Sequence, residues 1–197
     1  MMGTFRMANR ISLALGLAAL VACGGGGGGA GATPQPTKTT ADTLVYTNPT
    51  GGTYQLVKNA SKSTASHLVL DLLGPAGEVS GVGLYLTTDP SKATWTTVDP
   101  GDGEMLRSAT FSNPLNKSKV SGGTLQAGVY QKGATAAVSA TPSTVLVSVA
   151  IDLKSNVLIT NPPNILLTSG KALVLNAPTN PVPTTPITIA TGILSAN

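Results

Sequence analysis

The strongest constraint on the fold is a succession of short runs rich in Val, Leu, Thr and Tyr, each closed by Gly, Pro, Asn or Asp. From Asp42 onward, no window keeps apolar residues at the 3.6-residue spacing of an amphipathic helix for three turns. Such runs predict short strands, and a long series of them predicts an all-β fold, a single antiparallel β-sandwich. We expect strands at 43–47, 53–58, 67–73, 80–88, 94–98, 106–112, 124–131, 134–139, 143–153 and 171–176.

Alternation within these runs predicts which side chains face the core, because successive side chains on a strand point to opposite faces. In 143–153, we expect the branched apolar residues to point inward and Leu146, Ser148, Ala150 and Asp152 to point outward. In 80–88 the same argument places Tyr85 on the outward face. The predicted inward residues are Leu68, Leu70, Leu72, Val82, Leu84, Leu86, Val145, Val147, Val149, Ile151 and Leu153.

The N-terminus has the pattern of an export signal. Arg6 and Arg10 supply positive charge, and residues 11–22 form an apolar run of 12 without a charged residue. That length suits the apolar part of a signal peptide, roughly 7–15 residues, and is shorter than the about 20 residues that span a membrane.

The end of this run, Leu20-Val21-Ala22-Cys23, resembles the lipobox of bacterial lipoproteins, and Cys23 is the single cysteine of the chain. The resemblance implies cleavage before Cys23, a diacylglycerol on its sulfur and an acyl group on its new amine. Gly24, rather than Asp, follows the cysteine. By resemblance to the sorting rule of enteric bacteria, this favours the outer membrane, on its periplasmic face or at the cell surface. The alternative is an ordinary secreted protein with a stray cysteine.

Four regions are therefore predicted along the chain. Residues 1–22 are the signal peptide, and 23–41 are the lipidated cysteine with a linker, which begins with six glycines and cannot build a core. Residues 42–177 are the sandwich domain, and 178–197 are a Pro-rich tail with an edge strand near its end.

The segment 82–95 resembles the strand and turn of cohesin-like sandwich domains, in which an alternating strand enters an Asp-Pro-Ser turn, here Asp89-Pro90-Ser91. In that family a long aliphatic strand follows later, as 143–153 does here. The resemblance implies a nine-stranded sandwich of the jelly-roll kind rather than a barrel. Lys92-Ala93 stand where the family usually has a leucine, so dockerin binding is not carried over.

Charge and composition exclude several classes of function. The formal charge of +4 includes two arginines of the signal, so the mature chain carries ten basic and eight acidic side chains. Its lysines occur in small pairs among neutral residues rather than as one basic face, which argues against nucleic-acid binding. One Cys and one His exclude a disulfide framework and a Cys/His zinc site.

We do not expect an enzyme. His67 is the one candidate base for a hydrolytic triad, and G-x-S-x-G, S-x-x-K and phosphate-loop motifs are absent from the sequence. The favoured interpretation of His67 is a polar-face residue of a strand. A hydrolase built on His67 is the catalytic alternative.

Two groups of residues are candidate binding sites. Asp99, Asp102 and Glu104 bring three oxygen donors into a glycine turn; the favoured interpretation is a solvated turn, and a calcium site is the alternative. Trp95 and Tyr85 are a candidate aromatic platform for a sugar, although a core or rim position is the favoured interpretation of Trp95.

The sequence thus predicts a non-catalytic lipoprotein of the cell envelope, a binding or structural module that presents loops to a protein or a polysaccharide. The alternative is an accessory domain of an envelope enzyme system that binds calcium or glycan. Expected partners are the membrane, through the lipid, and an envelope protein or polysaccharide. No cofactor is expected apart from calcium in the alternative.

The lipid anchor can be tested directly. Fatty-acid labelling of the expressed chain should label the mature protein, and Cys23→Ala should abolish the label because it removes the acylated sulfur. Absence of label on the mature wild-type chain would contradict the lipoprotein interpretation.

Overall fold

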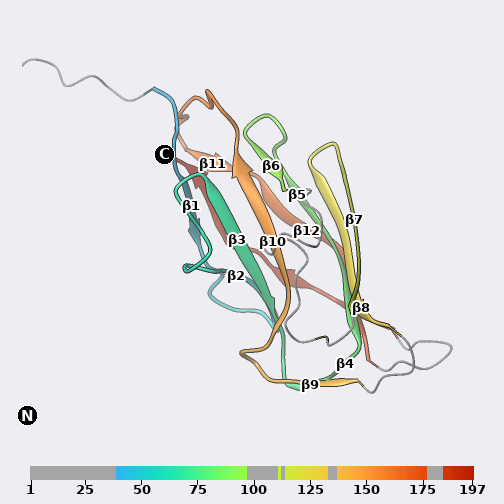
Figure 1. Cartoon of the computed structure of the whole chain (residues 1–197). Helices are drawn as coiled ribbons and strands as arrows, with labels where there is room; N and C mark the ends of the chain where they lie inside the picture. Colours follow the sequence, from blue (N-terminus) through green and yellow to red (C-terminus); the bar gives the residue numbers. More distant parts are fainter. Residues whose placement is uncertain (1–38, 97–110, 112–113, 133–136, 177–183) are drawn as a thin grey trace, which may run out of the picture. The chain divides into compact units, whose positions relative to one another are not determined.

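Fifteen strands make up the secondary structure of the computed structural model, which describes residues 39–96, 111, 114–132, 137–176 and 184–197. Within these residues there is no helix (Figure 1). All of them belong to one unit of the chain, residues 37–197. In chain order the strands are β1 (Leu44–Thr47), β2 (Tyr54–Lys58), β3 (His67–Leu73), β4 (Gly77–Val79), β5 (Gly81–Thr88), β6 (Ala93–Trp95), β7 (Pro114–Ser121), β8 (Thr124–Gln131), β9 (Val138–Ala140), β10 (Val145–Leu153), β11 (Asn164–Ile165), β12 (Leu167–Leu175), β13 (Thr184–Ile187), β14 (Ile189–Ala190) and β15 (Ile193–Ala196).

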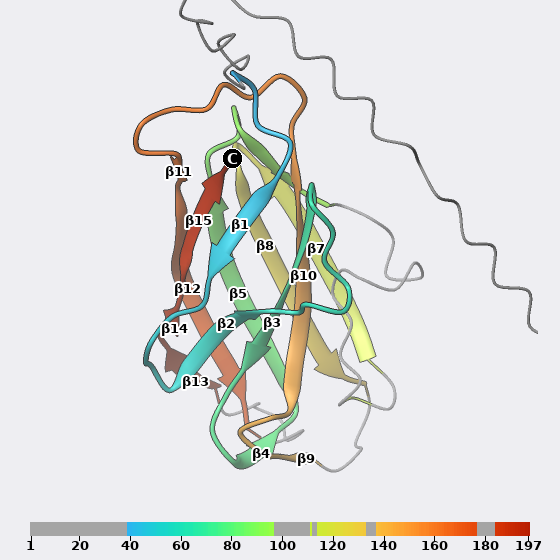
Figure 2. The ribbon, with the colours of Figure 1, turned by 90° about the vertical axis from the view of Figure 1, so that its left-hand side faces the viewer.

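Two five-stranded sheets form the body of the sandwich. One has the order β14-β2-β3-β10-β6 and the other has the order β13-β12-β5-β8-β7. A three-stranded sheet, β1-β15-β11, and a two-stranded sheet, β4-β9, complete the fold. Figures 1 and 2 show β3 and β10 in one layer and β5, β8 and β12 in the other. Every pairing between these strands is antiparallel except that of β14 with β2, so the predicted all-β sandwich is confirmed.

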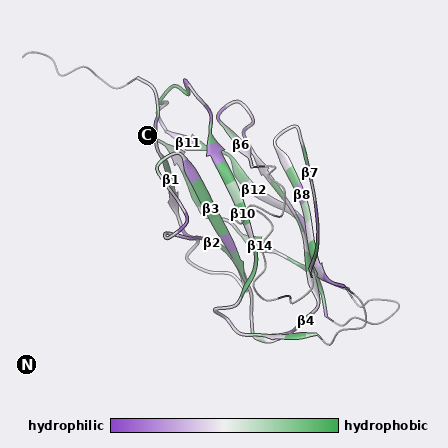
Figure 3. Cartoon of the chain, viewed as in Figure 1, coloured by the Kyte–Doolittle hydropathy of each residue, from purple (hydrophilic) through white to green (hydrophobic). Residues whose placement is uncertain are grey.

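The core lies between the inward faces of these two layers. Hydrophobic residues recur along β3, β5, β8 and β10 (Figure 3). Burial of each such side chain stabilises the fold by about 1.5–3 kcal/mol. Each of the following is at most 1% exposed: Leu68, Leu70, Leu72, Val82, Leu84, Leu86, Leu125, Val129, Val147, Val149 and Ile151. The inward faces predicted for 67–73 and 80–88 are therefore correct.

The solvent exposure predicted for the outer face of β10 is wrong, because Leu146, Ser148 and Ala150 are each at most 3% exposed. Leu146 lies at a register shift in the pairing with β3, and there its side chain joins the core. The buried hydroxyl of Ser148 donates to Asp71 Oδ1 at 2.6 Å, which offsets the cost of removing it from water. Asp71 in turn accepts from the side-chain amide of Asn59 at 2.8 Å, so the loop after β2 helps to cover this face.

The polar strand β7 was not predicted. Asn113-Pro114 suggests a turn, and residues 114–121 lack an apolar alternation. The structure places Pro114 at the start of the strand, where proline is tolerated, and β7 forms the edge of its sheet. An edge strand need not bury a full row of side chains, which explains its polar sequence. Of the expected strand at 106–112, only Phe111 is described, and it is buried outside any strand.

The C-terminal residues are part of the sheets rather than a tail with one edge strand. β13 pairs with β12 at a sheet edge, while β14 pairs with β2, and β15 lies between β1 and β11. A Cβ at Gly192 would lie 1.9 Å from the carbonyl oxygen of Thr47, so only glycine allows this close approach. At the other end, the domain begins before Asp42, because Thr40 pairs with Leu158 and Ala41 is buried.

Two substitutions test the burial of both faces of β10. Val147→Asp places a charge in the core, and Ser148→Asp places a second carboxylate beside Asp71. Each should lower the free energy of unfolding by several kcal/mol. In denaturant melts, Thr168→Asp at an exposed position of β12 should stay within about 0.5 kcal/mol of wild type. A Ser148→Asp variant as stable as Thr168→Asp would contradict a covered outer face.

Tyr46 links three segments of the fold. Its buried phenol donates to the carbonyl of Leu56 at 2.7 Å and accepts from the backbone N–H of Gly192 at 2.7 Å. Tyr46→Phe leaves both backbone groups without this partner, and we expect a loss of about 1–3 kcal/mol in the free energy of unfolding at neutral pH.

The same residue predicts a pH dependence. Burial raises the pKa of Tyr46 above its usual 10.0, while the hydrogen bond from Gly192 opposes the shift. The folded state therefore holds the phenolic proton more tightly, so this stabilisation is complete below pH 10 and declines as the pH rises through the folded pKa. Melts from pH 8 to 11 should show a steeper alkaline loss in wild type than in Tyr46→Phe, and parallel profiles would contradict this role.

Candidate functional site

Trp95 does not form part of a surface platform. Its side chain is 2% exposed, and its indole Nε1 donates to the carbonyl of Gly123 at 2.8 Å. Gly123 itself has a φ of +81°, which glycine adopts without strain. This burial agrees with the core position favoured for Trp95 and not with the ligand-binding candidate, because the indole anchors β6 to the β7–β8 turn.

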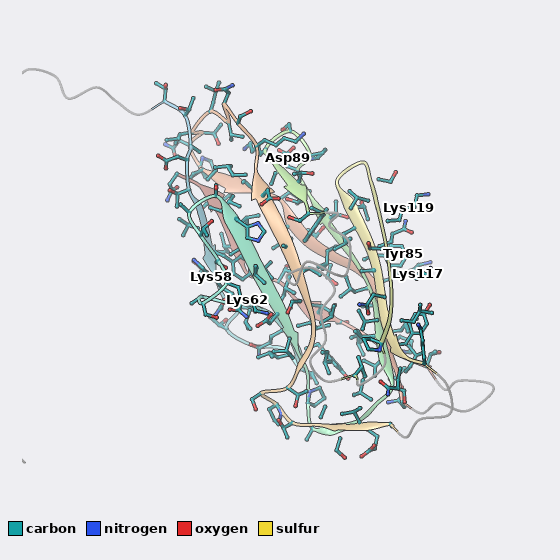
Figure 4. The ribbon with its side chains drawn as sticks, in the orientation of Figure 1. Lys58, Lys62, Tyr85, Asp89, Lys117 and Lys119 are labelled. Carbon is teal, nitrogen blue, oxygen red and sulfur yellow. The ribbon has the colours of Figure 1, made fainter. Side chains whose placement is uncertain are left out.

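Tyr85, in contrast, lies on the outer face of β5 as predicted and is 41% exposed. The strand register places it opposite Gln126 of β8, which is in turn opposite Lys119 of β7. Lys117 lies two residues before Lys119 on the same face and pairs with Gly128. Figure 4 shows Tyr85, Lys117 and Lys119 along the same flank of the sheet.

These side chains border a shallow hollow of about 290 Å³ on the outer face of the sheet. Its lining residues are Tyr85, Lys117, Ser118, Lys119, Gln126, Ala127 and Gly128. A Cβ at Gly128 would contact the ring of Tyr130 at 3.6 Å, so the glycine keeps the floor at the level of the backbone. The hollow thus combines one aromatic ring, two ammonium groups and an amide around an open floor.

All charged side chains in the strands of this sheet are positive. Its five strands contain Lys117, Lys119 and Lys171 and no Asp or Glu. Lys171 is exposed in an irregular stretch of β12, where Gly170 and Lys171 together lie opposite Tyr85. Because the lysines carry the only formal charges in these strands, the outer face presents a positive potential to an approaching ligand.

The other large sheet places its polar residues differently. His67 Nδ1 lies 2.5 Å from Asp152 Oδ1, and the hydroxyl of Thr96 donates to Asp152 Oδ2 at 2.7 Å. In this order the carboxylate is in the middle, whereas a hydrolytic triad has the imidazole between the nucleophile and the carboxylate. This geometry favours the polar-face interpretation of His67 over the hydrolase alternative.

The acidic cluster Asp99, Asp102 and Glu104 lies outside the described residues, so the calcium alternative stays a prediction. The neighbouring Asp89 accepts hydrogen bonds from the hydroxyl and the backbone N–H of Ser91, at 2.6 and 2.9 Å. These bonds lower the pKa of Asp89, as expected for a carboxylate that closes a turn. Among the described residues, no three His, Cys, Asp or Glu side chains gather as a metal site would require.

The candidate lipidation site, Cys23, also lies outside the described residues. In the part of the chain that the structure describes, no helix is long and apolar enough to cross a membrane.

Comparison with known proteins gives similarity in structure only. No protein-family model matches the chain, and no curated protein is similar to it in sequence. A similar solved structure is the sixth cohesin of scaffoldin B from Acetivibrio cellulolyticus, determined in complex with a Cel5 dockerin mutant. It has 16% identity and a TM-score of 0.46, over 71% of this chain and 96% of that one. Another is a cohesin module of a family 33 glycoside hydrolase from Clostridium perfringens, with 16% identity and a TM-score of 0.44, over 81% and 95% of the two chains.

The sandwich assignment itself follows from the strand pairing of this chain.

Proposed function

We propose that this chain is a non-catalytic binding module of the bacterial cell envelope, anchored by lipid at Cys23, and that it binds an acidic partner. The binding surface is the outer face of the β13-β12-β5-β8-β7 sheet. The observation that carries the proposal is the position of exposed Tyr85 beside Lys117 and Lys119, in a sheet whose strands contain no acidic residue.

The arrangement suits binding rather than chemistry. Lysine presents a compact charge with three donors on a flexible stem, so two lysines at one hollow can follow the carboxylates or sulfates of a partner. Charges of one sign on an open surface raise the rate of encounter with a partner of opposite charge, and salt weakens this effect. The proposed binding surface is a sheet face, whereas the sequence predicts that loops contact the partner.

The proposed anchor agrees with this role. The resemblance at Leu20-Val21-Ala22-Cys23 supports attachment to the outer membrane, and residues 24–38 separate the cysteine from the first described residue. A module tethered in this way would meet acidic polymers of the envelope while it stays at the membrane.

Dextran sulfate, a soluble polyanion, tests the proposed surface on the purified full-length chain. We expect Lys117→Gln/Lys119→Gln to weaken binding about 3- to 30-fold, because two exposed charge contacts contribute roughly 0.3–1 kcal/mol each. Binding should also weaken as sodium chloride rises from 50 to 300 mM.

Lys58→Gln/Lys62→Gln is the matched control, because it removes the same charge from a lysine pair on the other side of the ribbon (Figure 4). Its affinity should remain close to wild type. Equal weakening of the two double variants would show that net charge, and not this surface, governs binding. Absence of binding at low salt would contradict the proposed function.

A further inference from the structure

We infer that the acidic partner is an acidic polysaccharide, with Tyr85 as the platform for one sugar ring and Lys117 and Lys119 as donors to its acidic groups. This inference rests on the proposed function and specifies the ligand of the same surface. It commits to a polymer of sugars rather than to an acidic protein.

The size and chemistry of the hollow favour a sugar. At about 290 Å³ the hollow is small and open, with one aromatic side chain and a few polar side chains along its border. A pyranose ring offers an apolar C–H face and a rim of hydroxyls. The exposed ring of Tyr85 fits the face, while the amide of Gln126, directly opposite on β8, can both donate to and accept from the hydroxyls.

The surroundings of the hollow argue against a protein partner. The core of a protein interface is depleted in lysine and contains well-packed, fully desolvated side chains. In these five strands the exposed large hydrophobic residues are Tyr85 at 41% and Leu173 at 37%. One row across the sheet runs from Leu173 through two glycines, Gly83 and Gly128, to Lys117. A Cβ at Gly83 would contact the Leu173 side chain at 3.6 Å. This backbone floor offers little apolar surface to a folded partner.

The lysine spacing suits a charged polymer. Lys117 and Lys119 are two residues apart on one face of β7, so their backbones are about 6.6–6.8 Å apart along the strand. Tyr85 lies two strands away, about 9.4–9.8 Å across the sheet, in the same row as Lys119. Both lysine side chains are long enough to reach toward the hollow that they line, where an acidic sugar would satisfy the ammonium groups with charge-assisted hydrogen bonds.

Three polymers separate the ligand classes in calorimetric titrations of the full-length chain. Polygalacturonate carries both sugar rings and carboxylates, poly-L-glutamate carries carboxylates without sugars, and dextran carries sugars without charge. We expect polygalacturonate to bind at least tenfold more tightly than either of the others.

Equal binding of polygalacturonate and poly-L-glutamate would overturn this inference and leave the proposed function intact, because charge alone would then be recognised. Equal binding of dextran and polygalacturonate would contradict both, as would failure of every polyanion, dextran sulfate included. If dextran sulfate binds and polygalacturonate does not, an acidic sugar ring is not recognised, and the inference is overturned while the proposed function stands.

Variants of Tyr85 separate ring contact from charge. Tyr85→Ala should weaken polygalacturonate binding about tenfold and leave the binding of poly-L-glutamate unchanged, whereas Tyr85→Phe should keep most of the affinity because it retains the ring. Tyr85 is exposed, so thermal melts should show both variants folded. An equal loss with Tyr85→Phe and Tyr85→Ala, or no loss with Tyr85→Ala, would overturn the platform role.

Discussion

The burial of leucine and valine between the two large sheets determines where every other side chain of those sheets points. On β5, Leu84 and Leu86 are at most 1% exposed, so the residue between them, Tyr85, must face outward. The pairing of β7 with β8 carries the same alternation to the sheet edge and places Lys117 and Lys119 beside Tyr85. A slip of one residue in that register would turn both lysines toward the core side. The proposed binding surface is therefore a consequence of core packing.

The two large sheets manage polar side chains in different ways. In the sheet that contains β3 and β10, Asp71 pairs with Ser148 and Asn59, and Asp152 pairs with His67 and Thr96. Each carboxylate there has polar partners within the domain, which lowers the cost of removing it from water. The other sheet has three lysines and no acidic residue in its strands, so the charge of these strands is positive.

How far the sequence predicts the fold depends on how each strand is buried. β3 and β8 were predicted at their observed bounds, 67–73 and 124–131, because their apolar runs end in turn-forming residues. β7 could not be found this way, since an edge strand needs no apolar row. The burial of Ser148 depends on Asp71, 77 residues away, and no local pattern reports such a pairing. The sequence likewise predicted that Tyr85 is exposed, but it could not predict that Lys117 and Lys119 lie beside it, because that contact depends on the pairing of distant strands.

The central claim is that ligand contacts the outer face of the β13-β12-β5-β8-β7 sheet. Amide chemical-shift mapping by NMR during titration with oligogalacturonate tests it most directly, because it reports on both sheets at once. We expect the largest shifts at Tyr85, Gln126, Gly128, Lys117 and Lys119, with β3 and β10 almost unchanged. Shifts concentrated around His67, Asp152 and Thr96, or in the loops, would contradict it.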